Sequence, residues 1–83
     1  MTVWQLSLLA KEAAKMHDDG LISVNTYTAR PTEVHLCHRA FMELFPACYS
    51  DEAPYTYDGR LYQKRSIRID GIEFFTVMEV TNG

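Results

Sequence analysis

The side chains with the greatest potential for chemistry lie near the middle of the chain. His35, Cys37 and His38 are close together, Cys48 follows at a distance of ten residues, and His17 precedes them. Zinc binds such side chains in a tetrahedral set, but structural zinc sites usually present two close pairs of ligands. The second close pair is missing here. The sequence therefore favours a small buried cysteine and surface histidines over a metal site.

Nucleophilic catalysis has little support in this pattern. Cys37 and His38 are neighbours in sequence, and adjacent side chains of a strand or helix point apart, so their adjacency argues against a catalytic pair. The chain contains no nucleophile elbow, no phosphate-binding glycine loop and no paired-carboxylate motif. We therefore expect a protein that is not an enzyme and that uses no cofactor.

Length and composition predict one small domain over residues 1–83. The chain is 47% hydrophobic and 23% charged, which is typical of a folded protein rather than a disordered one. Two cysteines are too few for a disulfide framework, and no stretch reaches the roughly 20 apolar residues of a membrane span. We expect a cytoplasmic protein with no membrane partner. A core this small also favours self-association as a means of covering leftover apolar surface.

The first segment predicts an amphipathic helix. Thr2 and Gln5 match a capping box, residues 3–16 are strong helix formers, and Gly20 supplies a stop. Apolar residues recur at spacings of three and four, which gives a stripe that can lie on a sheet. The stripe comprises Val3, Leu6, Leu9 or Ala10, Ala13 and Met16, widened by Trp4 and Leu8.

The next segments predict two paired strands. Residues 21–28 are rich in β-branched and aromatic side chains and form a strand with Ile22 and Val24 inward. Residues 33–37 form the second strand, paired with the first.

A short helix is expected after this strand pair. It covers residues 38–45, and Pro46 ends it. The alternative is one continuous helix over residues 33–45, because the apolar residues of that stretch also fit a helical spacing.

The last segment predicts a β-hairpin. Residues 60–69 and 72–80 are β-prone runs joined by Asp70-Gly71, which favours a two-residue type I′ turn and fixes the register. The expected core-side pairs are Ile69 with Ile72, Ile67 with Phe74, Arg65 with Thr76, Gln63 with Met78 and Leu61 with Val80. The pairs on the other face are Arg68 with Glu73, Ser66 with Phe75, Lys64 with Val77 and Tyr62 with Glu79.

Together these elements predict an α+β fold. The N-terminal helix and the short second helix pack on one face of an antiparallel sheet, and the other face stays partly open. Residues 46–59, with two prolines and a glycine, form the longest loop. A loop of this length in a small domain is often functional. Its candidate partner-binding residues are Asp51, Glu52, Tyr55, Tyr57 and Asp58.

The non-core face of the hairpin is the second candidate surface. Phe75 and Val77 form an apolar centre, which is the composition of a protein interface when polar residues surround it. The surrounding residues are Tyr62, Lys64, Arg68 and Glu73. The alternative is that the N-terminal helix crosses this face and buries Phe75 and Val77 as core.

Two further binding modes follow from the same hairpin. Arg60, Lys64 and Arg68, with Tyr62 between them, resemble a platform for single-stranded nucleic acid. The net charge of -3 disfavours phosphate binding, so this remains the alternative function. Residues 72–80 are also a candidate open edge through which copies of the chain could assemble.

The chain resembles the small single-domain proteins encoded by phages and prophages. The likeness rests on the segment VHLCHRAFMELFP and on the terminal DGIEFFTVMEV, within residues 33–80. The resemblance implies an inhibitor that binds and occludes a host protein or protein–nucleic acid complex, such as a component of CRISPR or another defence system. It assigns no catalytic residue to this chain.

Overall fold

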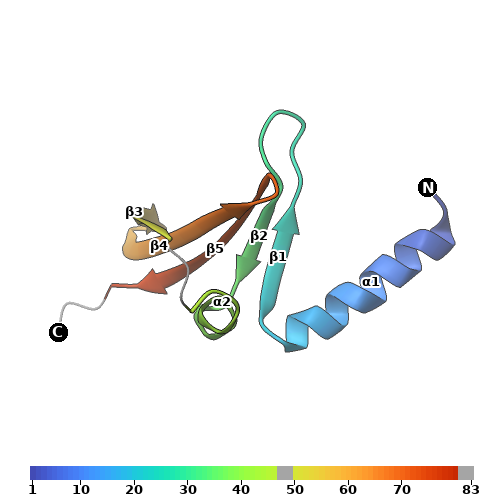
Figure 1. The fold of residues 1–83 in the computed structure, drawn as a ribbon, viewed down its shortest axis with the longest axis horizontal. Helices are drawn as coiled ribbons and strands as arrows, with labels where there is room; N and C mark the ends of the chain where they lie inside the picture. Colours follow the sequence, from blue (N-terminus) through green and yellow to red (C-terminus); the bar gives the residue numbers. More distant parts are fainter. Residues whose placement is uncertain (47–49, 81–83) are drawn as a thin grey trace.

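The computed structural model describes residues 1–46 and 50–80. Two helices accompany a five-stranded, mostly antiparallel sheet, which confirms the expected α+β fold (Figure 1). In chain order the elements are α1 (Val3–Asp18), β1 (Leu21–Asn25), β2 (Glu33–Leu36), α2 (His38–Leu44), β3 (Asp51–Tyr57), β4 (Arg60–Ile69) and β5 (Ile72–Glu79).

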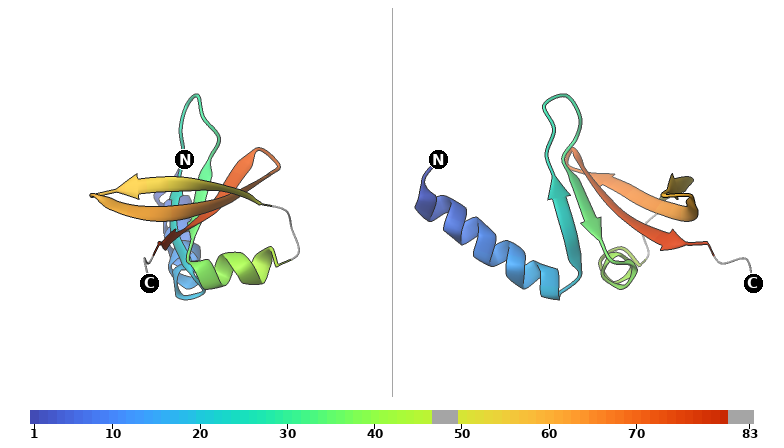
Figure 2. Two further views of the ribbon diagram at one scale, coloured as in Figure 1. Left: turned by 90° about the vertical axis from the view of Figure 1, so that its left-hand side faces the viewer. Right: turned by 180° about the vertical axis from the view of Figure 1, so that it is seen from behind.

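The sheet has the strand order β1-β2-β5-β4-β3. Neighbouring strands are antiparallel except for β2 and β5, which pair in parallel. This parallel pair joins the first half of the chain, up to α2, to the second half, which contains β3, β4 and β5. Helix α2 lies across one face of the sheet, whereas α1 extends away beyond β1 (Figure 2).

The predicted C-terminal hairpin is confirmed with its register. Ile69 pairs with Ile72, Ile67 with Phe74, and the following pairs continue as far as Tyr62 with Glu79. Asp70 and Gly71 both have positive φ, 55° and 75°, as a type I′ turn requires.

The prediction of a long loop over residues 46–59 is wrong for the part that the structure describes. Asp51–Tyr57 form β3, which pairs with β4 along its whole length. Asp58 and Gly59 have φ of 52° and 74°, so they repeat the turn seen at Asp70-Gly71. Pro54 is tolerated because β3 lies at the edge of the sheet, where one side of the strand needs no ladder hydrogen bonds.

The prediction of an open edge at residues 72–80 is also wrong. Strand β5 lies in the interior of the sheet, between β2 and β4, because the parallel pairing with β2 occupies its outer side. The edges of the sheet are β1 and β3.

A strand followed by a helix, rather than one continuous helix, occupies residues 33–45. Cys37 ends the strand and caps α2, its sulfur accepting a hydrogen bond from the Ala40 N–H at 3.4 Å. Ala40 and Phe41 are buried, together with Leu36 of β2. Partly buried Ile67 and Phe74 of the hairpin pack against this cluster, so the core forms beneath the β2–β5 junction.

Helix α1 has the predicted capping box, with reciprocal hydrogen bonds between Thr2 and Gln5 of 2.8 and 3.1 Å. Its main contact is with β1, and none of its residues is buried. The predicted apolar stripe is therefore left uncovered over most of its length.

Ile22 and Val24, which were expected to point inward, are not buried. Their side chains are exposed, whereas Leu21 packs against the core. Two features account for this difference. A bulge between Leu21 and Ser23 interrupts the alternation of β1, and Val24, which pairs with Val34, lies on the edge strand of the sheet.

The Thr76 hydroxyl should limit the stability of the fold. Thr76 is 1% exposed, and its oxygen finds no hydrogen-bond partner among the described residues. We expect Thr76→Val to raise the free energy of unfolding by about 1 kcal/mol, because a methyl group then replaces the unsatisfied hydroxyl. The matched variant Thr76→Ser keeps the hydroxyl and loses a methyl group, so it should lower that free energy by about 1 kcal/mol. Urea unfolding at one protein concentration measures both, and a destabilised Thr76→Val protein would contradict this account.

Gly20 should tolerate no side chain. Its φ is +113°, and an added Cβ would lie 2.5 Å from the Ala40 Cβ and 2.8 Å from the Cys37 sulfur. We expect Gly20→Ala to lower the free energy of unfolding by about 2 to 5 kcal/mol, from backbone strain and overpacking together.

Gly59→Ala is the matched control for this prediction. Gly59 also has positive φ, but an added Cβ meets no described atom within 4 Å. We expect this variant to lose only the strain part, about 1 kcal/mol. Equal losses for the two variants in thermal unfolding would show that the contact of Gly20 with α2 is not tight.

Candidate functional site

The sheet has an open face on the side opposite to α2. Side chains alternate along a strand, so every second residue faces away from the core. The strand registers bring these residues of β2, β5, β4 and β3 together on one surface. We call this surface the open face, and its aromatic members are His35 on β2, Phe75 on β5, Tyr62 on β4, and Tyr55 with Tyr57 on β3.

Phe75 lies at the centre of the open face. The His35 ring stacks on it, with a centroid distance of 4.4 Å and an interplanar angle of 13°. From β4, on the other side of β5, the Lys64 ammonium lies 4.6 Å from the centroid of the Phe75 ring. The ring is thus held by an aromatic contact and a cation–π contact.

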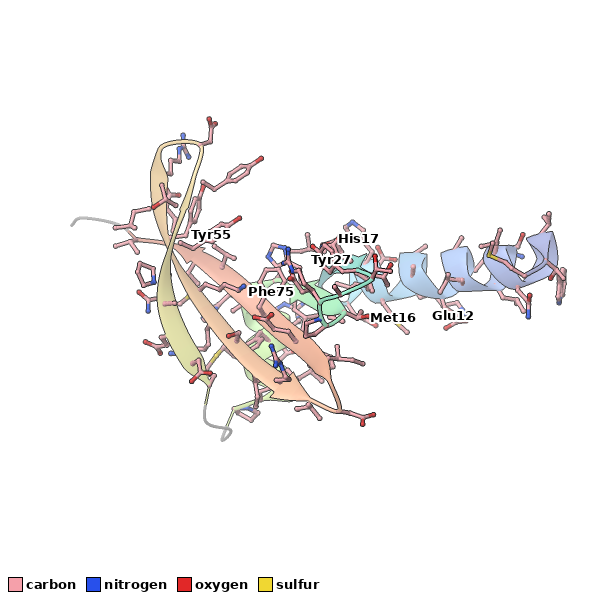
Figure 3. All side chains as sticks on the ribbon, turned by 90° about the horizontal axis from the view of Figure 1, so that it is seen from above. Glu12, Met16, His17, Tyr27, Tyr55 and Phe75 are labelled. Carbon is pink, nitrogen blue, oxygen red and sulfur yellow. The ribbon has the colours of Figure 1, made fainter. Side chains whose placement is uncertain are left out.

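A groove of about 530 Å³ runs along this cluster. Tyr55, Tyr57, Tyr62 and Phe75, all predicted as partner-binding residues, line it together. The Tyr55 and Tyr62 rings are tilted against each other at a centroid distance of 6.4 Å. Figure 3 views the open face from above, with Tyr55 and Phe75 along the hairpin and α1 extending away from them. Neither helix covers Phe75, so the alternative in which α1 buries it is not what the fold adopts.

Most charged side chains of the open face form ion pairs with one another. Lys64 lies 3.4 Å from Glu73, and Arg60 lies 3.7 Å from Glu79. Arg68 faces Glu73 across the β4–β5 pair and, with Asp51, lines a second hollow of about 360 Å³. Lys64 and Arg60 are therefore compensated by carboxylates, whereas Arg68 makes no ion pair among the described residues.

The predicted acidic residues do not form one cluster. Asp51 belongs to the open face, opposite Ser66. Glu52 points to the other side, where it accepts a hydrogen bond from the Arg65 guanidinium. Asp58 lies in the turn between β3 and β4. The strand alternation of β3, which was expected to be a loop, separates these three carboxylates.

The histidine and cysteine residues singled out by chemistry are also dispersed. His35 stacks on Phe75, Cys37 caps α2, and His38 is exposed at the start of that helix. Within residues 1–46 and 50–80, no group of three or more His, Cys, Asp or Glu side chains is placed to hold a metal ion. Cys48 lies outside the described residues.

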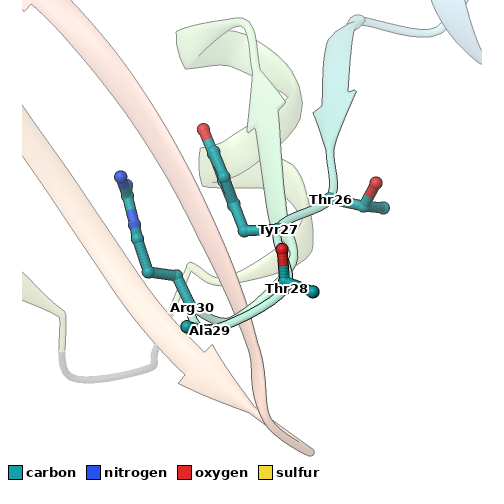
Figure 4. Close-up of a pocket in the computed structure, with 5 residues that line it drawn as sticks. All are labelled: Thr26, Tyr27, Thr28, Ala29 and Arg30. Carbon is teal, nitrogen blue, oxygen red and sulfur yellow. The ribbon is translucent and has the colours of Figure 1, made fainter.

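Sequence reasoning did not place the two aromatic side chains His35 and Tyr27 at the binding surface, although both line the groove. Tyr27 belongs to the loop after β1, where the Arg30 guanidinium lies 4.3 Å from the centroid of its ring (Figure 4). Arg30 also pairs with Glu33 at 2.8 Å, so the loop is tied to the start of β2. The loop borders a hollow of about 620 Å³, lined by residues 26–30 alone. In the sequence, this side of the groove was indicated only by the strand predicted over residues 33–37, in which Glu33 and His35 lie on the same face.

The environment of His35 opposes its protonation. Partial burial and, to a smaller extent, the nearby Lys64 ammonium lower the pKa of His35 below its ordinary value of 6.5. The imidazole that stacks on Phe75 is therefore the neutral form at physiological pH, and it can accept or donate a hydrogen bond at the groove.

No helix of the described residues is both long and apolar enough to cross a membrane. No protein-family model, curated protein or solved structure matches this chain.

The lowered pKa of His35 makes the stability of the open face depend on pH. Since the unfolded chain takes up this proton first, the free energy of unfolding should fall as pH falls through about 6.5. We expect His35→Gln to remove this part of the pH dependence, so that its unfolding free energy changes less between about pH 7 and about pH 5.5. His38→Gln, at an exposed position, is the matched control and should keep the slope of the unmodified protein. Identical slopes for all three proteins would contradict the role of His35.

Proposed function

We propose that this chain is a non-enzymatic interaction protein that binds a macromolecule through its open face. The observation that carries the proposal is the aromatic cluster around Phe75, which lines a groove that neither α1 nor α2 covers. Tyr57 is 64% exposed and Tyr55 is 41% exposed. Aromatic side chains at the centre of a surface and ion pairs at its rim are the composition of a protein–protein interface. Tyrosine is also among the residues that contribute most to such interfaces.

The charge of the open face favours a protein over a nucleic acid. Phosphate binding needs cations that are free to replace counterions. Lys64 and Arg60 instead pair with Glu73 and Glu79, and Arg30, which lies over the Tyr27 ring, pairs with Glu33. A protein that carries both positive and negative side chains can form new ion pairs with these residues. A polyanion would instead be repelled by their carboxylates.

The resemblance to phage-encoded proteins supports a more specific mode of action. In this proposal the chain acts in the host cytoplasm and occludes a functional surface of a host protein or protein–nucleic acid complex, such as a component of CRISPR or another defence system. Asp51, at the end of the open face, and Asp58, in the exposed β3–β4 turn, supply negative charge toward a basic channel. Such charge complementarity speeds encounter more than it raises affinity.

Replacing both Tyr55 and Tyr62 by alanine should strongly weaken partner binding. We expect the double variant Tyr55→Ala, Tyr62→Ala to lose binding by about 30-fold or more, because each ring lines the groove and residues of this kind contribute about 2 kcal/mol or more to an interface. The measurement is affinity capture from a lysate of the natural host cells, with quantitative mass spectrometry, followed by titration of the captured protein.

Trp4→Ala is the matched control, since Trp4 is 70% exposed but lies on α1, away from the open face. It should retain the captured protein. A partner that is lost with Trp4→Ala and kept by the tyrosine variant would place the binding site elsewhere and refute the proposal.

A single-stranded nucleic acid is the second candidate partner, and the exposed aromatic rings are the observation that favours it. In this alternative the triple variant Arg60→Ala, Lys64→Ala, Arg68→Ala abolishes a salt-dependent gel shift with oligonucleotides. The leading proposal expects no shift with the unmodified protein at physiological salt.

A further inference from the structure

Helix α1 presents apolar side chains on a surface that the rest of the described chain leaves uncovered. Val3 is 80% exposed, Leu6 is 45%, Leu9 is 65% and Met16 is 52% exposed. Their spacings of three and seven residues place them on one side of the helix. We call this side the α1 stripe. Contiguous apolar surface of this kind on a small protein marks an interaction site.

The α1 stripe continues into a groove between the helix and the edge strand β1. This groove has a volume of about 520 Å³ and a mostly apolar lining. Leu9 and Ala13 line it from the helix, and Ile22 and Val24 line it from the strand. The exposed apolar residues of both elements thus form one continuous surface, which meets the groove of the open face at Ile22.

The total surface of the chain is larger than that of a compact monomer of the same mass. A folded monomer of 9.6 kDa is expected to expose about 5,100 Å². This chain exposes 6496 Å². The excess of about 1,400 Å² is larger than the area that one partner buries in an interface of standard size. Its radius of gyration, 14.5 Å, likewise exceeds the value of about 12 Å expected for a compact domain of this length.

The small core indicates that this surface is covered whenever the protein is folded. Among the described residues, the buried hydrophobic side chains are Leu36, Ala40 and Phe41. A core of this size gives little stability by itself, and small domains often compensate by oligomerisation. A second molecule of the same chain is a partner that is always present when the protein folds.

We propose that α1 pairs with α1 of a second copy in a two-fold antiparallel arrangement, and that the partner's helix also closes the groove beside β1. Two copies that each bury the excess surface would cover about 2,800 Å², which lies in the range of obligate homodimers. The proposal centres on α1, which contributes no residue to the groove of the open face, so it stands independently of the proposed function.

The sequence of α1 suits this arrangement. An antiparallel pair centred between residues 9 and 10 sets larger side chains opposite smaller ones over most of its length, which allows close approach of the helices. The opposed pairs are Val3 with Met16, Leu6 with Ala13, and Leu9 with Ala10. The charged residues of the helix cancel, so two copies do not repel each other; they are Lys11, Lys15, Glu12 and Asp18.

Light scattering and disulfide crosslinking test the proposal together. The unmodified protein should have twice the 9.6 kDa mass of the chain, with a thermal midpoint that rises with protein concentration. Ala10→Cys should form a covalent dimer on mild oxidation, because Ala10 lies next to the two-fold axis. This variant keeps the helix and does not depend on disrupting the fold.

Lys15→Cys is the matched control. Lys15 is exposed on the polar side of α1, 3.3 Å from Glu12, and should not crosslink above the background set by the native cysteines. A folded protein of single-chain mass would overturn the proposal. Crosslinking at Lys15→Cys equal to that at Ala10→Cys would overturn the pairing through the α1 stripe, as would a dimer in which neither variant crosslinks.

Discussion

The packing of α2 beneath the junction of β2 and β5 holds the two halves of this chain together. Phe41 is 1% exposed, its ring lies 5.1 Å from that of Phe45, and the Phe45 ring lies 5.6 Å from that of Phe74. One short helix covers one side of the central strands, and no second helix of the described residues covers the other side. Because this core is small, the aromatic open face and most of α1 are left uncovered. The described residues thus leave much apolar surface exposed and enclose little interior.

Local signals in the sequence predicted much of the fold. The Asp70-Gly71 turn determined the C-terminal hairpin because a type I′ turn leaves a single register for the flanking strands. The same signal at Asp58-Gly59 was present but was outweighed by Pro54 and the neighbouring acidic residues, which are unfavourable in a central strand. They are acceptable in β3 because it is an edge strand, and edge position is a property of the whole sheet.

The residues of the candidate site also fall into those that the sequence could place and those that it could not. Phe75, Tyr62 and Lys64 could be placed on one face from the hairpin register alone. His35 could not be added to them, because its contact with Phe75 depends on a parallel pairing between strands far apart in the chain. The separation of Glu52 from Asp51 likewise followed only once β3 was known to be a strand. Side-chain alternation is therefore informative where the strand assignment is secure, and pairing between distant strands needs the structure.

The parallel pairing of β2 with β5 also has a consequence for the order of folding. The hairpins around Asp58-Gly59 and Asp70-Gly71 close through two-residue turns, and isolated hairpins form in about 1 to 10 μs. Joining β2 to β5 closes a loop of about 40 residues, which costs about 2 to 3 kcal/mol more in chain entropy than a tight turn. We therefore expect the three C-terminal strands to pair first, and α2 to pack against them in a later and slower step.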